Sequence, residues 1–257
     1  MAKLFDTREG RLLRAMEQAP HVIWRNLRNN KRVVLFVVAV VLFLGILQNM
    51  LAGDLLRLDY YAYRIFVVRM RRAWLTPIMQ SISELALPVV LVVMLLAVQA
   101  FAPGRRPGLF AALNLVGVVL VNQVFKFIVQ RPRPEGFRLI AESGYSFPSG
   151  HSMVAMGFYG LLAWMAWHYE RDAHVRRVSV AGFGLVIVLI GISRIYLGVH
   201  YASDVIAGFC LSAAWLMLYT TIVAPIFLSE DETGLGGGEA RPSADETSAT
   251  DERELSE

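Results

Sequence analysis

Long apolar stretches, separated by short polar segments, recur along most of this 257-residue chain. None of them has the polar face that marks a helix on the surface of a soluble protein. About 20 helical residues cross a bilayer, and shorter apolar cores are completed by their flanks, so the pattern predicts six transmembrane helices. The stretches are residues 33–50, 85–101, 109–129, 153–167, 178–192 and 205–228. We therefore expect an all-α integral membrane protein.

The composition supports this class. Hydrophobic residues make up 56% of the chain and charged residues only 18%, which is apolar for a soluble protein of this size. A soluble helical protein would also need amphipathic surfaces between its core helices, and the chain offers few, so we set that class aside. The single cysteine, Cys210, excludes a disulfide framework and a cysteine-based metal site.

Charge divides the chain into three parts. Residues 1–32 are basic, with apolar residues at roughly helical spacing, and predict a cytoplasmic segment with an interfacial helix. Residues 33–228 predict one six-helix membrane domain. Residues 229–257 are rich in Gly, Ser and acidic residues and predict a disordered cytoplasmic tail. Lys and Arg beside membrane helices report topology and contact with anionic lipid, so we expect a bilayer and no nucleic acid as partner.

One loop conflicts with the topology that a cytoplasmic N-terminus implies. The basic residues at 105–106 and 171–177 fall inside, as the positive-inside rule requires, but the arginine-rich segment 57–72 falls outside. Aromatic side chains surround these arginines, which is typical of a belt in the membrane interface. The belt consists of Arg57, Arg64, Arg69, Arg71 and Arg72 with Tyr60, Tyr61, Tyr63, Phe66 and Trp74. It would anchor the segment or, alternatively, guide an anionic lipid head group.

Three polar clusters adjoin the predicted helices, and the topology brings all three to the outer face. Among their cations are Lys126, Arg133 and Arg194. Ionisable residues beside membrane spans usually line a polar cavity, and three cations together indicate a phosphate site. A glycine before a helix start lets backbone N–H groups approach an anion closely, and the helix dipole adds to the attraction. Ser149, Gly150 and the N–H of His151 are placed for such contacts.

Two histidines in these clusters predict catalysis. His200 and Asp204 lie four residues apart and share one face of a helix, where the carboxylate can fix the imidazole tautomer and prepare a nucleophile. His151 could donate a proton to the leaving alkoxide. Because no group of carboxylates suited to a two-metal phosphatase lies near these loops, the sequence requires no metal and no other cofactor.

The three clusters resemble the three-part signature of the type 2 phosphatidic acid phosphatase family. They read Lys126-x6-Arg133-Pro134, Pro148-Ser149-Gly150-His151 and Ser193-Arg194-x5-His200-x3-Asp204. The resemblance covers roughly residues 83–225. It implies a six-helix membrane phosphatase with its active site at the extracytoplasmic ends of helices three to six. It further implies that His200 is the nucleophile, Asp204 its orienting carboxylate and His151 the general acid and later base. The implied phosphate-binding residues are Lys126, Arg133, Ser149, Gly150 and Arg194.

We therefore predict a lipid phosphatase of the cell membrane that works through a phosphohistidine and faces the periplasm or exterior. Undecaprenyl diphosphate, placed first, phosphatidylglycerol phosphate and phosphatidate are the candidate substrates, and neither the choice among them nor the oligomeric state is specified by the sequence. Three other functions stay open: a phosphotransferase using the same phosphohistidine, an oxidative enzyme like the related vanadium haloperoxidases, and a non-catalytic scaffold or transporter.

Overall fold

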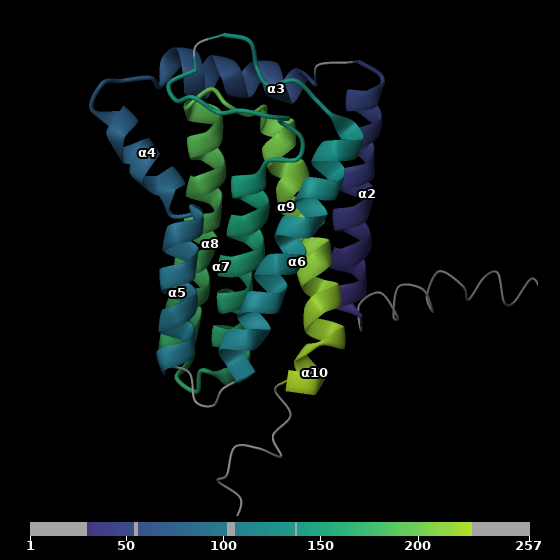
Figure 1. Ribbon diagram of the computed structural model, residues 1–257, viewed down its shortest axis with the longest axis vertical. Coiled ribbons are helices and arrows are strands. Elements are labelled where there is room, and N and C mark those ends of the chain that lie inside the picture. Colours follow the sequence, from purple (N-terminus) through teal and green to yellow (C-terminus); the bar gives the residue numbers. More distant parts are fainter. Residues whose placement is uncertain (1–29, 54–55, 102–105, 137, 228–257) are drawn as a thin grey trace, which may run out of the picture.

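A bundle of long helices, crossed at one end by a short helix, forms the computed structural model of the protein (Figure 1). The structure describes residues 30–53, 56–101, 106–136 and 138–227. Within these ranges the regular elements are all helical. They are α2 (Lys31–Leu51), α3 (Arg57–Ala62), the π-helix η2 (Tyr63–Arg69), α4 (Leu75–Glu84), α5 (Pro88–Phe101), α6 (Arg106–Val129), α7 (Gly150–Tyr169), α8 (Ala173–Tyr196), α9 (Ala202–Ile222) and α10 (Ala224–Phe227). The expected interfacial helix before residue 30 and the acidic tail 229–257 lie outside the described residues.

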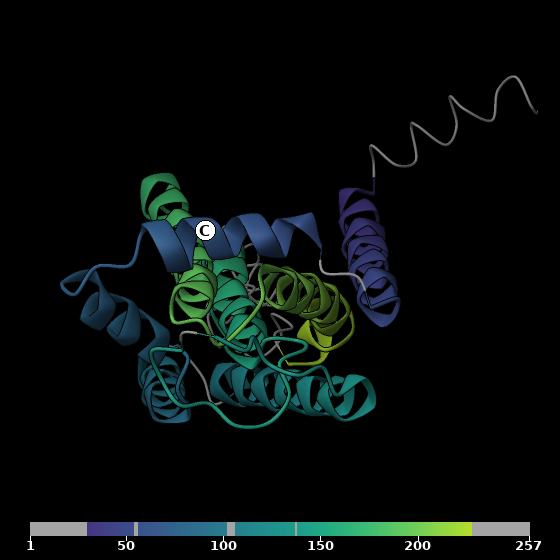
Figure 2. The same cartoon turned by 90° about the horizontal axis from the view of Figure 1, so that it is seen from above.

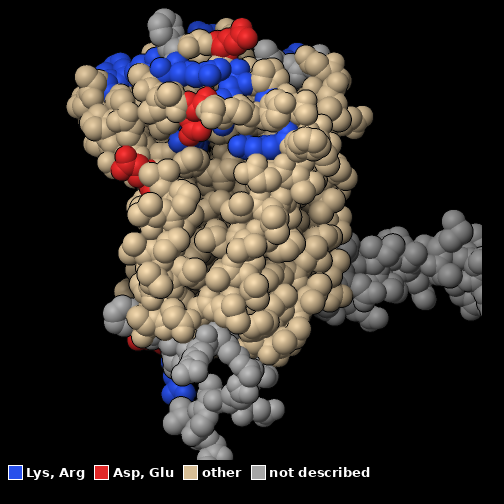
Figure 3. Space-filling model, in the orientation of Figure 1, with Lys and Arg blue, Asp and Glu red and all other residues tan. Residues whose placement is uncertain are grey.

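The apolar helices make this a multi-pass membrane protein. In the described part of the chain, four helices are long and apolar enough to cross a bilayer, namely α2, α6, α8 and α9. The bent pair α4 and α5 would make a fifth span. Figure 3 shows the corresponding surface, on which charged side chains gather at one end and a broad uncharged band lies below them. These five elements coincide with five of the six predicted spans.

The sixth predicted span, 153–167, corresponds to α7, which does not belong to that set. This helix lies inside the bundle, packed against α6, α8 and α9 (Figures 1 and 2). Because its side chains contact protein more than lipid, it can carry small and polar residues such as Ser152 and Gly157 without exposing them to hydrocarbon. Six spans therefore remain a prediction.

The span predicted over 85–101 begins three residues later in the structure and follows a bend. The chain bends by 53° between α4 and α5, and Pro88 is the first residue of α5. Proline lacks a backbone N–H and disfavours helical conformation in the residue before it, so a helix readily begins at proline but seldom continues through it. The bend brings α4 against α8, which places α4 side chains beside the polar clusters.

Small residues and buried amides hold the N-terminal half of α7 against its neighbours. A Cβ atom added at Gly208 in α9 would lie 3.0 Å from the carbonyl oxygen of Ser149, so only glycine allows this approach. The side-chain amide of Asn122 in α6 donates to the Pro148 carbonyl at 3.1 Å. Asn114, about two turns further into the membrane domain along α6, donates to the Gly157 carbonyl at 2.8 Å. The turn that begins α7 is thus fixed from two sides.

The predicted aromatic and basic belt corresponds to α3 and η2, which lie crosswise over the end of the bundle (Figures 1 and 2). Tyr60 and Tyr61 are exposed on this segment, and the guanidinium of Arg64 lies over the Tyr60 ring at 5.6 Å. Asp59 instead is buried, 4% exposed, on the side facing the bundle. The segment thus has an amphipathic outer face and one acidic contact with the helices beneath it.

Candidate active site

The structure brings the three predicted clusters together at the end of the bundle that α3 crosses. Lys126 lies in the last turn of α6, Gly150 is the first residue of α7, and Arg194 lies in the last turn of α8. His200 follows in the connection to α9, and Asp204 occupies the first turn of α9. Four helix ends therefore converge, and the loop between α6 and α7 contributes the remaining residues.

The two arginines are almost completely buried. Arg194 is 1% exposed and Arg133 is 5% exposed. Arg194 donates from Nη1 to Ser83 Oγ of α4 at 2.6 Å. Arg133 donates to three backbone carbonyls, those of Ser143, Gly144 and Val199, at 3.0 to 3.1 Å. These bonds hold each guanidinium in one orientation, and Arg133 ties the α6–α7 loop to the α8–α9 connection.

Glu142, which the sequence reasoning missed, lies between the two arginines. Its carboxylate forms an ion pair with Arg194 and lies 3.5 Å from Arg133 Nη2. Burial raises the pKa of Glu142, but the charge and hydrogen bond of Arg194, together with Arg133, outweigh burial and hold this pKa below its ordinary value. Lys126 interacts electrostatically with the same three side chains. A phosphate group bound by these cations would compete with the Glu142 carboxylate.

The two ring nitrogens of His200 have different surroundings. Arg133 Nη1 lies 3.2 Å from His200 Nε2. Since arginine can only donate, Nε2 is the accepting nitrogen and the ring proton resides on Nδ1. Nδ1 faces Asp204 Oδ2 at 3.5 Å, longer than a hydrogen bond, so this carboxylate acts on the ring by its charge. Burial lowers the pKa of His200 to about 4 even though Asp204 acts in the opposite direction, which leaves the imidazole uncharged at pH 7.

Asp204 is shared with a second, unpredicted group of charges. Its Oδ1 pairs with Arg131 Nη1 at 2.6 Å, and its Oδ2 accepts from the Tyr201 N–H at 2.9 Å. Arg131 also reaches Asp59 of α3 at 3.3 Å. Asp59 in turn accepts from the backbone N–H and the hydroxyl of Ser203 at 2.7 and 2.8 Å. The crossing helix is thereby connected through Arg131 to the carboxylate that faces His200.

The turn at the start of α7 supplies anion-binding groups in part. Ser149 caps the helix: its side-chain oxygen accepts from the Ser152 backbone N–H at 3.4 Å and also from the Ser152 hydroxyl at 2.9 Å. Its own backbone N–H donates to the Asp204 carbonyl at 3.1 Å, so it holds α9 to α7. The predicted contacts with an anion would therefore be made by the backbone N–H groups of Gly150 and His151. The first N–H groups of a helix have no intrahelical acceptor and can donate to a bound anion.

The assembled site combines cations, a neutral imidazole and a second histidine. His151 interacts electrostatically with Arg194, Glu142, His200 and Lys126, so both predicted catalytic histidines lie at one place. Among the described residues, no group of three or more His, Cys, Asp or Glu is arranged to hold a metal ion. The side chains present can therefore bind an oxyanion, attack it with Nε2 of His200 and transfer a proton through His151.

The position of Glu142 predicts that the substitution Glu142→Gln raises the affinity for inorganic phosphate. The amide keeps the shape of the side chain but no longer neutralises the arginines, and loss of a partly exposed ion pair worth about 1 kcal/mol corresponds to roughly fivefold tighter binding. Calorimetric titration of the purified protein with inorganic phosphate measures this affinity. Glu135→Gln, in an exposed part of the same loop, is the control. Unchanged phosphate affinity in Glu142→Gln would contradict the idea that phosphate and the Glu142 carboxylate compete for the two arginines.

Comparison with known proteins agrees with the site. The PAP2 superfamily profile matches residues 107–227. The chain is 35% identical over 148 residues to phosphatidylglycerophosphatase B of Bacillus subtilis (strain 168), covering 56% of this chain and 73% of that protein. Over 127 residues it is 31% identical to undecaprenyl-diphosphatase of Sulfolobus acidocaldarius, covering 45% of this chain and 54% of that enzyme.

A solved structure agrees over a longer range. The crystal structure of the first transmembrane PAP2 type phosphatidylglycerolphosphate phosphatase from Bacillus subtilis superposes with a TM-score of 0.64 at 30% identity. The match covers 75% of this chain and 95% of that one. Helix arrangement, sequence identity and the three motifs all point to one family, so this chain belongs to the PAP2 superfamily and is a phosphatase of that family.

Proposed function

We propose that the protein hydrolyses phosphate from a membrane lipid through a phosphohistidine on His200, without a metal ion. The observation that carries this proposal is the buried pair of arginines beside an uncharged imidazole, because it provides both a phosphate-binding site and a nucleophile. The named relatives, a phosphatidylglycerophosphatase and an undecaprenyl-diphosphatase, support a lipid phosphate or diphosphate as the substrate.

The first chemical step would form the phosphohistidine. Phosphate oxygens replace Glu142 between Arg133 and Arg194, and Nε2 of His200 attacks the phosphorus. The negative charge of the bound phosphate favours the protonated form of His151. The bond from phosphorus to the ester oxygen breaks as the bond to nitrogen forms, and the proton of His151 passes to the leaving alkoxide. The positive charge that develops on His200 is stabilised by Asp204, while the arginines stabilise charge on the transferred phosphoryl group.

The second step reverses the proton transfer. His151, now neutral, accepts a proton from a water molecule, and the resulting hydroxide attacks phosphorus as the bond to Nε2 breaks. Inorganic phosphate leaves, His200 returns to its neutral form and His151 is again charged. Asp204 keeps the ring proton on Nδ1 throughout, so the same nitrogen serves as nucleophile and leaving group.

Phosphate release by purified protein tests this function. We expect release from undecaprenyl diphosphate, phosphatidylglycerol phosphate or phosphatidate in the presence of EDTA. His200→Ala should lower it by about 10³-fold or more, since it removes the nucleophile, and His151→Ala by about 10²- to 10⁴-fold. His174→Ala, in the first turn of α8 at the opposite end of the bundle, should behave as the wild type. Retention of more than a tenth of the activity by His200→Ala would contradict the mechanism, and transfer of phosphate to an alcohol would indicate the transferase.

The site would face the periplasm or exterior of a cell membrane, with α7 completing six spans. The opposite end of the bundle carries Arg171, Arg176 and Arg177, whereas the belt at the site end combines arginines with aromatic residues. Basic residues between membrane helices favour the cytoplasmic side, which supports this orientation.

Labelling of engineered cysteines in intact cells tests the orientation. A membrane-impermeant maleimide should modify Glu135→Cys in the α6–α7 loop and leave Arg171→Cys in the α7–α8 connection unmodified, because only the first position would be outside. Both positions are exposed, and labelling of the native Cys210 gives the background signal. The reverse labelling pattern would place the site in the cytoplasm.

A further inference from the structure

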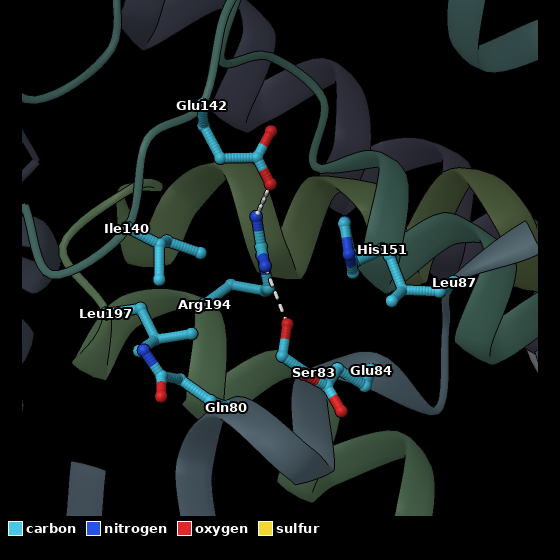
Figure 4. A pocket seen from close by; sticks show the side chains of 9 residues that line it. All are labelled: Gln80, Ser83, Glu84, Leu87, Ile140, Glu142, His151, Arg194 and Leu197. Atoms are coloured by element: carbon cyan, nitrogen blue, oxygen red, sulfur yellow. Dashed lines mark hydrogen bonds and ion pairs between the residues drawn. The ribbon is translucent and has the colours of Figure 1, made fainter. Parts of the chain in front are cut away.

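A cavity of about 330 Å³ opens beside His151, and its far wall comes from α4 (Figure 4). His151, Arg194 and Glu142 form the side that belongs to the catalytic site. Gln80, Ser83 and Glu84, at the end of α4 where the chain bends toward α5, form the other side. The mechanism uses the first three residues and leaves the α4 residues without a function.

The cavity lies on the leaving-group side of the site. Attacking and leaving atoms are arranged roughly in line about the phosphorus in phosphoryl transfer. His200, the proposed nucleophile, lines a different and smaller cavity together with Asp59 and Tyr201. The larger cavity instead contains His151, which would protonate the leaving oxygen. A group attached to that oxygen therefore extends into the space between His151 and α4.

The α4 residues that line the cavity differ in the hydrogen bonds that they can offer a ligand. Ser83 is buried and its hydroxyl accepts from Arg194, so it positions that arginine and contributes little else. Gln80 offers an amide that both donates and accepts, and Glu84 offers a carboxylate that only accepts when ionised. A hydroxyl group on the ligand can donate a hydrogen bond to the Gln80 amide oxygen or to the Glu84 carboxylate, so the α4 residues are best suited to bind hydroxyl groups.

The charges around the cavity also affect which substrates can bind. Glu84 and Glu142 both border the cavity, and a phosphate bound by the arginines would release Glu142 from its ion pairs. Arg194, which lines the same cavity, would then be engaged by the scissile phosphate, so a second phosphate attached directly to it would lie beside two carboxylates. Repulsion between like charges separated by about 6 Å at an effective dielectric constant of roughly 20 to 40 is large enough to lower binding by tenfold or more.

We propose that Gln80 and Glu84 form a leaving-group subsite that selects phosphate monoesters with a free hydroxyl beside the ester oxygen, as in a glycerol phosphate, over diphosphates. This inference rests on the proposed function and names its substrate class. It reverses the order expected from the sequence, since undecaprenyl diphosphate becomes the least favoured candidate. Phosphatidylglycerol phosphate, whose leaving group is a glycerol with a free hydroxyl, becomes the most favoured, and phosphatidate, which lacks that hydroxyl, lies between them.

Ratios of kcat/KM among these three lipids test the subsite in purified protein. Ratios within one preparation do not depend on the fraction of folded enzyme. The wild type should prefer phosphatidylglycerol phosphate over phosphatidate by about tenfold, the loss expected when a hydrogen bond to a charged group is missing. Glu84→Gln and Gln80→Leu should each reduce this preference several-fold, and Glu84→Gln should raise relative activity on undecaprenyl diphosphate. Glu170→Gln, at the opposite end of α7, should leave every ratio unchanged.

The outcomes separate the subsite from the underlying function. A wild type that prefers undecaprenyl diphosphate, or ratios that stay the same in Glu84→Gln and Gln80→Leu, would overturn the subsite while His200-dependent phosphate release upholds the phosphatase. Absence of release from all three lipids by the wild type would overturn the proposed function, and the subsite with it.

Discussion

The burial of two guanidinium groups at one end of a membrane bundle is the constraint on which the rest of the site depends. An isolated charge removed from water costs several kcal/mol, so Arg133 and Arg194 need polar partners. Arg133 finds three backbone carbonyls, Arg194 finds the Ser83 hydroxyl, and both approach Glu142. These partners fix the loops that connect the helices. Both guanidinium groups are directed at the position of the Glu142 carboxylate, where a phosphate group would replace it.

The proposed nucleophile, His200, depends on a second group of charges on its far side. Asp204 faces His200 but pairs more closely with Arg131, which Asp59 of the crossing helix also contacts. The positive charge of Arg131 partly neutralises Asp204, which weakens the effect of this carboxylate on the imidazole, and burial keeps the ring uncharged. A neutral imidazole with its proton on Nδ1 has its electron pair on Nε2, the nitrogen beside Arg133. The same contacts join α3 to the start of α9, so the interfacial segment and the active site are parts of one structure.

Much of the fold and the core of the site could be predicted from the sequence, because their signals are local. Apolar runs identify membrane helices without knowledge of their partners, and the three motifs place Lys126, His151 and His200 at helix ends that the topology brings together. The break before Pro88 was also a local signal, since proline rarely lies inside a helix. The apolar run that starts at Leu85 hid this break, so the predicted span began three residues too early.

The remaining site residues are contributed by chain segments without a motif. Asp59 lies 144 residues from its partner Ser203, and Glu142 and Glu84 are single acidic residues in unremarkable surroundings. No periodicity marks such positions, because only tertiary structure makes them neighbours. Three cations at one site, with no anion predicted to pair with them, were the one available sign that a carboxylate such as Glu142 had to be nearby.

Trapping of the covalent intermediate tests the central claim, that His200 is a nucleophile in a cation-lined phosphate site. Lipid substrate labelled in its terminal phosphate would be mixed with the enzyme at low temperature, quenched in alkali within milliseconds, and the labelled residue mapped by mass spectrometry. The account predicts at most one phosphoryl group per site, attached to His200 and absent from His200→Ala. Label on another residue, or full turnover with no labelled protein at any time point, would contradict it.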